Sequence, residues 1–149
     1  MMQGLARQAV AWVLLALALS SCRPASYEQF VRSDQARGGE YLFELDMSDS
    51  SATYDVSLYT RADAPLMTSE RPDSQMALSV RWFAPSDSAA LAETVFLPCG
   101  GVAGSVQLYR SGICPRPSGT WKVSVRVKDA PEGLRGVGII CKRNSNGTR

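Results

Sequence analysis

The strict alternation of apolar and polar residues is the feature that most limits how this chain of 149 residues can fold. It is clearest at residues 121–127, and it recurs at 41–47, 54–59, 76–82 and 106–108, with less regular apolar runs at 91–97 and 137–141. Successive side chains of a strand point to opposite faces, so this period indicates half-buried antiparallel strands. The pattern predicts about seven or eight strands, and no amphipathic helix competes with them.

Turn-forming residues separate the predicted strands. They lie at 49–51, 63–65, 85–87, 100–101 and 117–119. We therefore expect residues 40–142 to form an all-β domain, a single antiparallel β-sandwich of jelly-roll or immunoglobulin-like type, with a β-barrel as the alternative. Trp82 and Trp121 lie on the apolar sides of their predicted strands, which favours packing in the core.

The N-terminal residues have the features of an export signal. Arg7 precedes an apolar run at 10–19, which is too short to span a membrane as a helix. The run ends in Leu19-Ser20-Ser21-Cys22, which matches the bacterial lipobox, so residues 1–21 are predicted to be a lipoprotein signal peptide and Cys22 the lipidated first residue. Each buried methylene contributes about 0.8 kcal/mol, so several acyl chains on Cys22 would anchor the protein durably. The alternative is an ordinary signal peptide with a chance cysteine.

The residues after the lipobox predict where the anchor is inserted. Cys22 is followed by Arg23. In the sorting rule of many Gram-negative lipoproteins an aspartate at this position favours the inner membrane, so Arg23 favours the outer membrane. Residues 23–27 lack an acidic cluster of the kind that resembles a surface-export signal, which favours the periplasmic side over the cell surface. We expect residues 22–39 to be a lipidated tether and 143–149 a flexible tail.

The charge balance and the absence of histidine argue against several functions. The chain has 16 basic and 14 acidic residues and no histidine. It lacks the basic clustering of a nucleic-acid-binding protein, and it cannot carry Ser-His-Asp or Cys-His catalysis or histidine-bound zinc. Asp46, Asp49 and Asp55 lie close together, but a polar hairpin turn explains them better than a calcium loop. Glu44 and Asp55 could meet as a carboxylate pair, as in any sandwich. We expect no metal, no cofactor and no catalytic residues, and hence no enzyme.

Three cysteines remain after the predicted cleavage and lipidation. Cys99 and Cys114 each lie beside a turn at a strand end, with one predicted strand between them. A disulfide joining them is allowed in an oxidising compartment and would contribute roughly 3 kcal/mol in the chain-entropy model. Cys141 shares a face with Val137 and Ile139, which favours a buried thiol. The alternative is that all three are reduced and buried.

Two tyrosines are candidates for surface contacts. Tyr59 follows Leu58 and Tyr109 follows Leu108, so the alternation places both tyrosines on the polar outer faces of their strands. Exposed tyrosines on one sheet could stack on a sugar ring or contact a protein partner. Scattered surface tyrosines without a function are the alternative.

The order of several segments resembles that of a known lipoprotein family. The segments are 54–61, 104–106, 118–125, Leu134 and 136–140. The layout is similar to the GldH-like gliding-motility lipoproteins of Bacteroidetes over residues 40–142. This resemblance implies an outer-membrane component of gliding-motility or protein-secretion machinery with a cell-envelope protein partner and no catalytic residues. A carbohydrate-binding lipoprotein of the cell envelope is the alternative function.

Overall fold

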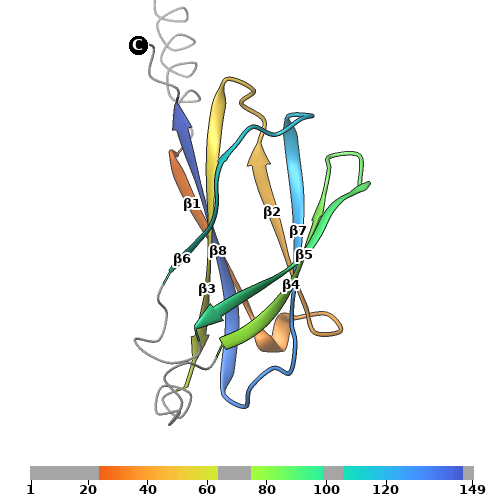
Figure 1. Cartoon of the computed structure of the whole chain (residues 1–149), viewed down its shortest axis with the longest axis vertical. Helices are drawn as coiled ribbons and strands as arrows, with labels where there is room; N and C mark the ends of the chain where they lie inside the picture. The colour runs from red at the N-terminus through yellow and green to blue at the C-terminus, as the bar shows by residue number, and fades with distance from the viewer. Residues whose placement is uncertain (1–23, 64–74, 99–105, 146–149) are drawn as a thin grey trace, which may run out of the picture.

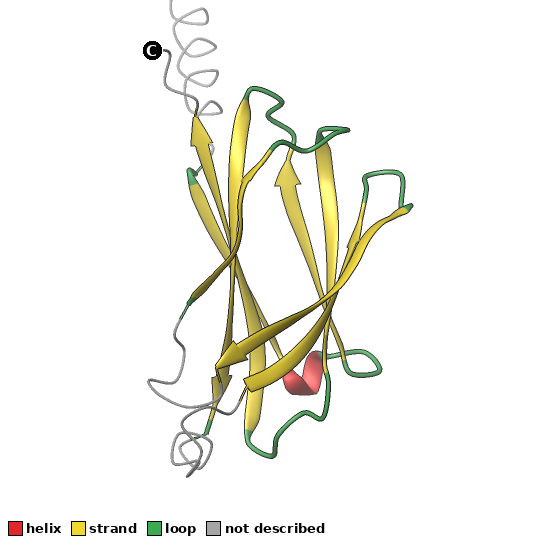
Figure 2. Cartoon of the chain, viewed as in Figure 1, coloured by secondary structure: helices red, strands yellow, loops and turns green. Residues whose placement is uncertain are grey.

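The computed structural model describes residues 24–63, 75–98 and 106–145, and these residues form an all-β domain (Figure 2). The strands are β1 (Ser26–Arg32), β2 (Glu40–Met47), β3 (Ala52–Ala62), β4 (Gln75–Phe83), β5 (Ala89–Pro98), β6 (Gln107–Ile113), β7 (Gly119–Val127) and β8 (Leu134–Ser145). One short 3-10 helix, η1 (Ser33–Gln35), follows β1. The predicted all-β sandwich is confirmed, with eight strands.

The strands form two four-stranded antiparallel sheets that pack face to face (Figure 1). The orders are β1-β8-β3-β6 and β2-β7-β4-β5. The first four strands pair with the last four in reverse order, as β1–β8, β2–β7, β3–β6 and β4–β5. Among the described strands, β4 and β5 follow one another in the chain and lie in the same sheet, whereas each other pair of consecutive strands is divided between the two sheets. This reverse pairing of the first four strands with the last four, distributed over two sheets, is the jelly-roll topology, one of the two expected sandwich types.

The core is made by the inward side chains of both sheets, as the alternation predicts. Phe43 and Leu45 of β2 and Val123 and Val125 of β7 are almost fully buried. Trp82 is buried, and Trp121 is partly buried and packs against the same core. The outward residues between them are mostly polar, so the hydrophobic effect fixes which face of each strand turns inward.

The expected tether is wrong for most of its length, because β1 lies within it. Ser26 to Arg32 pair along β8, from Ser26 opposite Lys142 to Arg32 opposite Gly136. The alternation of β1 is hidden because Gln29, a polar residue, occupies a position that faces the second sheet, where the pattern would require an apolar residue. Its side-chain Nε2 donates to the Glu44 carbonyl at 2.5 Å, and its Oε1 accepts from the Glu44 backbone N–H at 3.2 Å. Gln29 thus satisfies backbone groups of β2, the edge strand of that sheet.

The C-terminal boundary also differs from the expectation. β8 continues to Ser145, where it pairs with Ala52 of β3, so residues 143–145 belong to the sheet. The domain therefore extends beyond both expected limits, 40 and 142. Both extensions are held by pairing with distant strands, which leaves little signal in the local sequence.

The two ends of the sandwich are distinct. The N-terminal pole is defined here by residues 24–25, the connections 48–51, 84–88 and 114–118, and the end of β8 (Figure 1). The register places these together, since Met47 lies opposite Gly119 and Phe83 opposite Ala89. The opposite pole carries η1 and the connection 128–133. There Ser33 of η1 donates from its Oγ to the carbonyl of Leu134, the first residue of β8, at 2.8 Å.

Candidate functional site

An aromatic groove lies between the edge strands β5 and β6, next to the N-terminal pole. Two adjoining cavities of about 270 and 210 Å³ share Trp82, Ile113 and Trp121. The larger cavity is also lined by Met47 and the connection 114–116, and the smaller by Ala90, Leu91 and Arg110. These residues define the tryptophan groove, whose walls are mainly apolar.

The two indole rings of the tryptophan groove are held in fixed positions. Trp82 and Trp121 meet edge to face, with centroids 6.3 Å apart and an interplanar angle of 66°. The Trp82 indole N–H donates to the Tyr109 hydroxyl at 3.1 Å, and the Trp121 indole N–H donates to the Pro117 carbonyl at 3.0 Å. Both polar handles are therefore satisfied within the protein, and the groove presents apolar ring surface.

Ionisable groups beside the tryptophan groove are engaged with one another. Glu93 points toward β6, accepts from the Tyr109 hydroxyl and forms an ion pair with Arg110, whose Nη2 lies 2.9 Å from Glu93 Oε1. Burial alone would raise the pKa of Glu93, but the hydrogen bonds from Tyr109 and Arg110 outweigh it and lower that pKa. Burial, together with the bond to Glu93, raises the pKa of the Tyr109 hydroxyl. This network holds a charged carboxylate and supports the groove wall.

The predicted orientation of β6 is wrong. Leu108 is 64% exposed, whereas Tyr109 is partly buried, packs against the core and forms the hydrogen bonds just described. The pairing of β6 with β3 shifts register between Tyr54 and Ser57, so the faces of β6 do not follow from the strand partner alone. Tyr109 is not the exposed contact residue that the alternation indicates.

Tyr59 does lie on the outer face of its sheet, but it is not exposed. Its side chain is 3% exposed and covers Gly138 of β8. The Phe30 ring stacks with it, with centroids 6.0 Å apart, and the Arg61 guanidinium lies 5.0 Å from the Phe30 centroid. The Tyr59 hydroxyl donates to Glu28. Burial and this bond raise the pKa of Tyr59 to about 12. The predicted surface contact through Tyr59 is therefore wrong, because β1 supplies a cover that the local sequence does not reveal.

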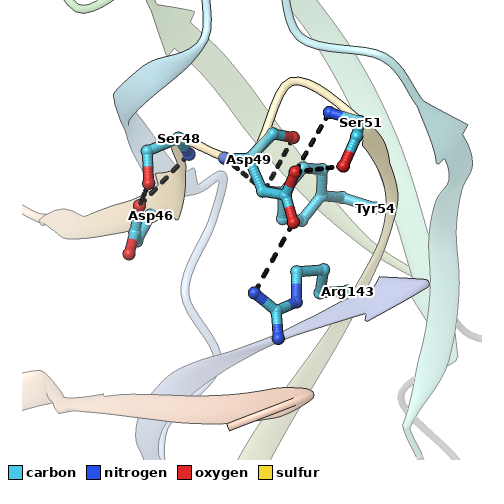
Figure 3. Close-up of polar contacts among 6 residues, drawn as sticks. All are labelled: Asp46, Ser48, Asp49, Ser51, Tyr54 and Arg143. Carbon is cyan, nitrogen blue, oxygen red and sulfur yellow. Dashed lines mark hydrogen bonds and ion pairs between the residues drawn. The ribbon is translucent and has the colours of Figure 1, made fainter. Parts of the chain in front are cut away.

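The acidic turn between β2 and β3 is shown in Figure 3. The Asp46 carboxylate accepts from the backbone N–H and Oγ of Ser48, at 3.1 and 2.6 Å. The Asp49 carboxylate accepts from the same two groups of Ser51, at 3.0 and 2.6 Å, and pairs with Arg143 at 3.7 Å. Carboxylates used in this way are typical of turns. The turn is polar as expected, but it crosses between sheets and is not a hairpin.

The third aspartate, Asp55, is engaged in hydrogen bonds with two neighbouring strands. Asp55 accepts from the Gly112 backbone N–H at 2.8 Å and from Asn144 Nδ2 at 2.7 Å, and these two bonds lower its pKa. Within the described ranges no group of three or more Cys, Asp or Glu side chains is placed to hold a metal ion. The same residues contain no helix long and apolar enough to cross a membrane.

The cysteines fall into different environments. Cys141 is a buried thiol of the core, as predicted, and burial raises its pKa. Cys114 is exposed in the wall of the tryptophan groove. Its expected disulfide partner Cys99 and the expected lipidation site Cys22 lie outside the described residues. The Cys99–Cys114 pairing therefore stays a prediction.

The fold and groove together define a jelly-roll protein with an aromatic groove at one pole. No protein-family model matches the chain, and no curated protein matches it. A crystal structure of a protein from Sulfurospirillum deleyianum is similar at 10% identity and a TM-score of 0.42, covering 83% of this chain and 100% of that one. A structure of the infectious bursal disease virus Gx strain is similar at 11% identity and a TM-score of 0.35, covering 83% and 32%. The jelly-roll assignment rests on the strand pairing of this chain itself.

Proposed function

We propose that this chain is a lipid-anchored outer-membrane protein that acts as a non-enzymatic structural or interaction component of the cell envelope. The observation that carries the proposal is the lipobox at Leu19 to Cys22, which ends four positions before β1 begins at Ser26. A membrane anchor joined this closely to an eight-stranded domain suits a protein that presents a rigid surface at the membrane.

The use of the ionisable groups in the described residues supports a role without catalysis. Glu93 is tied to Tyr109 and Arg110, Asp49 to Arg143, and each of these contacts stabilises a turn or a strand edge. A general acid at neutral pH would need a carboxyl whose pKa is raised, and the pKa of Glu93 is lowered. The arrangement therefore supports a binding or scaffolding role.

The anchor is tested by labelling cells that express the full chain with a radioactive or alkyne-tagged fatty acid. We expect label on the wild-type protein and its loss in Cys22→Ala. Cys114→Ala is the matched control, because it removes an exposed cysteine that lies outside the lipobox. Equal labelling of wild type and Cys22→Ala would refute the anchor.

The finer proposal, drawn from the resemblance to GldH-like lipoproteins, is a place in gliding-motility or protein-secretion machinery. It is tested in a deletion strain of the native bacterium by colony spreading and by the profile of secreted proteins. We expect loss of at least one of these, restored by the wild-type gene and not by Cys22→Ala. A deletion strain that is normal in both would refute this role.

Carbohydrate binding is the second candidate, and the tryptophan groove is the observation that favours it. Sugar rings stack on aromatic faces, and the partly exposed Trp121 offers such surface in the groove, whereas Tyr59 is buried. Binding of a defined glycan that is lost in Trp121→Ala, and kept in Leu108→Ala, would support this function over the scaffold. Trp121 is the better target because it is less buried than Trp82.

A further inference from the structure

We infer that the N-terminal pole of the sandwich faces the lipid bilayer and rests on its headgroup surface. The inference deepens the proposed function and rests on lipidation of Cys22. It concerns the orientation of the whole domain, which decides which of its surfaces a partner can reach.

The first step is the length of the connection between anchor and domain. Four residue steps separate Cys22 from Ser26, where β1 begins. A fully extended chain covers at most about 3.6 Å per step, so β1 begins no more than about 14 Å from the acylated residue. The expected tether of residues 22–39 would have let the domain move well away from the membrane, and β1 removes that freedom.

The second step is the attachment of this short connection. The Ala25 carbonyl accepts from the Arg143 backbone N–H at 2.6 Å, one residue before β1 pairs with β8. The sheet therefore holds the chain up to Ala25, and the anchored end leaves the domain at the N-terminal pole, on the side of β1 and β8 (Figure 1).

The third step is the shape and charge of the N-terminal pole. Its three connections, 48–51, 84–88 and 114–118, are four or five residues long, so none of them projects far. Its acids are matched by bases, since Asp49 pairs with Arg143 at 3.7 Å and Asp87 with Lys122 at 2.7 Å. Arg116 adds a cation in the third connection. The pole is thus close to neutral or slightly basic and is not repelled by anionic headgroups.

The fourth step is the tryptophan groove. Its larger cavity is lined by Met47 at the end of β2, by the connection 114–116 and by Trp121 near the start of β7, all of which lie at the N-terminal pole. Of its two indole rings, Trp121 is partly exposed and Trp82 is buried, and the walls of the groove are mainly apolar. The groove therefore places apolar surface on the side that the short connection holds against lipid.

The opposite pole is carried away from the membrane by the length of the strands. β3 has 11 residues and runs between the two poles. At about 3.3 Å per residue it spans roughly 35 Å. η1 and the connection 128–133 would then face the periplasm, and that pole would be the part of the protein open to a partner.

The test uses the full lipidated chain in phosphatidylethanolamine–phosphatidylglycerol vesicles that contain nitroxide-labelled lipid. A fluorophore is attached to Ser50→Cys or Ser118→Cys at the N-terminal pole, or to Lys128→Cys or Glu132→Cys at the opposite pole, with Cys99 and Cys114 replaced by serine. These four side chains are exposed. We expect strong loss of fluorescence at positions 50 and 118 and none at 128 and 132.

A linker variant is the matched control. Ten Gly and Ser residues inserted between Pro24 and Ala25 leave Cys22 and the sandwich intact but lengthen the connection, so the loss of fluorescence at positions 50 and 118 should fall. Equal quenching at both poles would mean that the sandwich lies on its side and would overturn the inference. So would the absence of quenching at both poles in protein whose acylation is proven by mass. Mass spectra without acyl chains would instead refute the anchor, and with it the proposed function.

Discussion

The ring of Tyr59 covers Gly138 across the pairing of β3 with β8, in the space where any other residue at position 138 would place its side chain. Phe30 of β1 lies opposite Gly138 in the register and stacks on Tyr59, and its ring tip lies over Gly136 of β8. The missing side chains of two glycines in β8 are thus replaced by aromatic rings from its two neighbouring strands. Glycine weakens a strand interior by itself, and rings laid over it restore apolar packing.

Gly138→Ala should destabilise the domain, because the new Cβ would overlap the Tyr59 ring. Overpacking of this kind costs typically about 1–3 kcal/mol of unfolding free energy. Urea unfolding followed by circular dichroism measures it. In a Tyr59→Ala background the same substitution should have a smaller effect, and an equal effect in both backgrounds would show that the close approach is not the cause.

Tyr59→Phe should reduce the alkaline sensitivity of the fold. Burial and the bond to Glu28 raise the pKa of Tyr59 from 10.0 to about 12, so the unfolded chain loses this proton first as pH rises. The contribution of the neutral phenol is therefore complete below pH 10 and is lost between pH 10 and about 12. Tyr54 and Tyr109 also have raised pKa values, so the wild-type urea midpoint should fall over this range and that of Tyr59→Phe should fall less. Identical slopes for the two proteins would contradict the assignment.

Tyr109→Phe should destabilise the domain although it keeps the ring. The hydroxyl accepts from the Trp82 indole N–H and donates to Glu93, and its loss leaves a partly buried donor without its partner. An unsatisfied group of this kind costs about 1–3 kcal/mol. Urea unfolding followed by tryptophan emission tests this, with Leu108→Ala as the neighbouring control. Since Leu108 is 64% exposed, its truncation should have little effect. If Leu108→Ala destabilised the domain more than Tyr109→Phe, the orientation of β6 would be the one that the alternation predicts, with Leu108 inward.

Cys99 and Cys114 should form a disulfide in protein isolated from an oxidising compartment. Closure of the loop between them would contribute roughly 3 kcal/mol, and reduction should lower the urea midpoint accordingly. Peptide mapping without reductant detects the bridge. Cys141 is the internal control, because its buried thiol with a raised pKa should react with iodoacetamide only after unfolding. Finding Cys99 and Cys114 both alkylated in the native protein would reject the pairing.

Much of the fold could be predicted from alternation, and the candidate site much less. The segments at 41–47, 76–82 and 121–127 become β2, β4 and β7 with the expected faces inward. β1 escaped prediction because Gln29 takes an inward position and bonds to the backbone of β2. A polar residue in that place looks like a loop until its distant partner is known. The tryptophan groove also could not be predicted, because it forms where the edges of two sheets meet and so depends on residues far apart in the chain.

The sequence alone determined that the chain forms strands and which faces of most of them turn inward, and it carries the match of Leu19-Ser20-Ser21-Cys22 to the lipobox pattern. Each of these depends on residues close together in the chain, through the two-residue period of the strand or the contiguous signal before a cysteine. Only the tertiary structure decided the reverse pairing of the jelly roll, the burial of Tyr59 and the inward turn of Tyr109. These depend on contacts between residues far apart in the chain, and such contacts exist only once both sheets have formed.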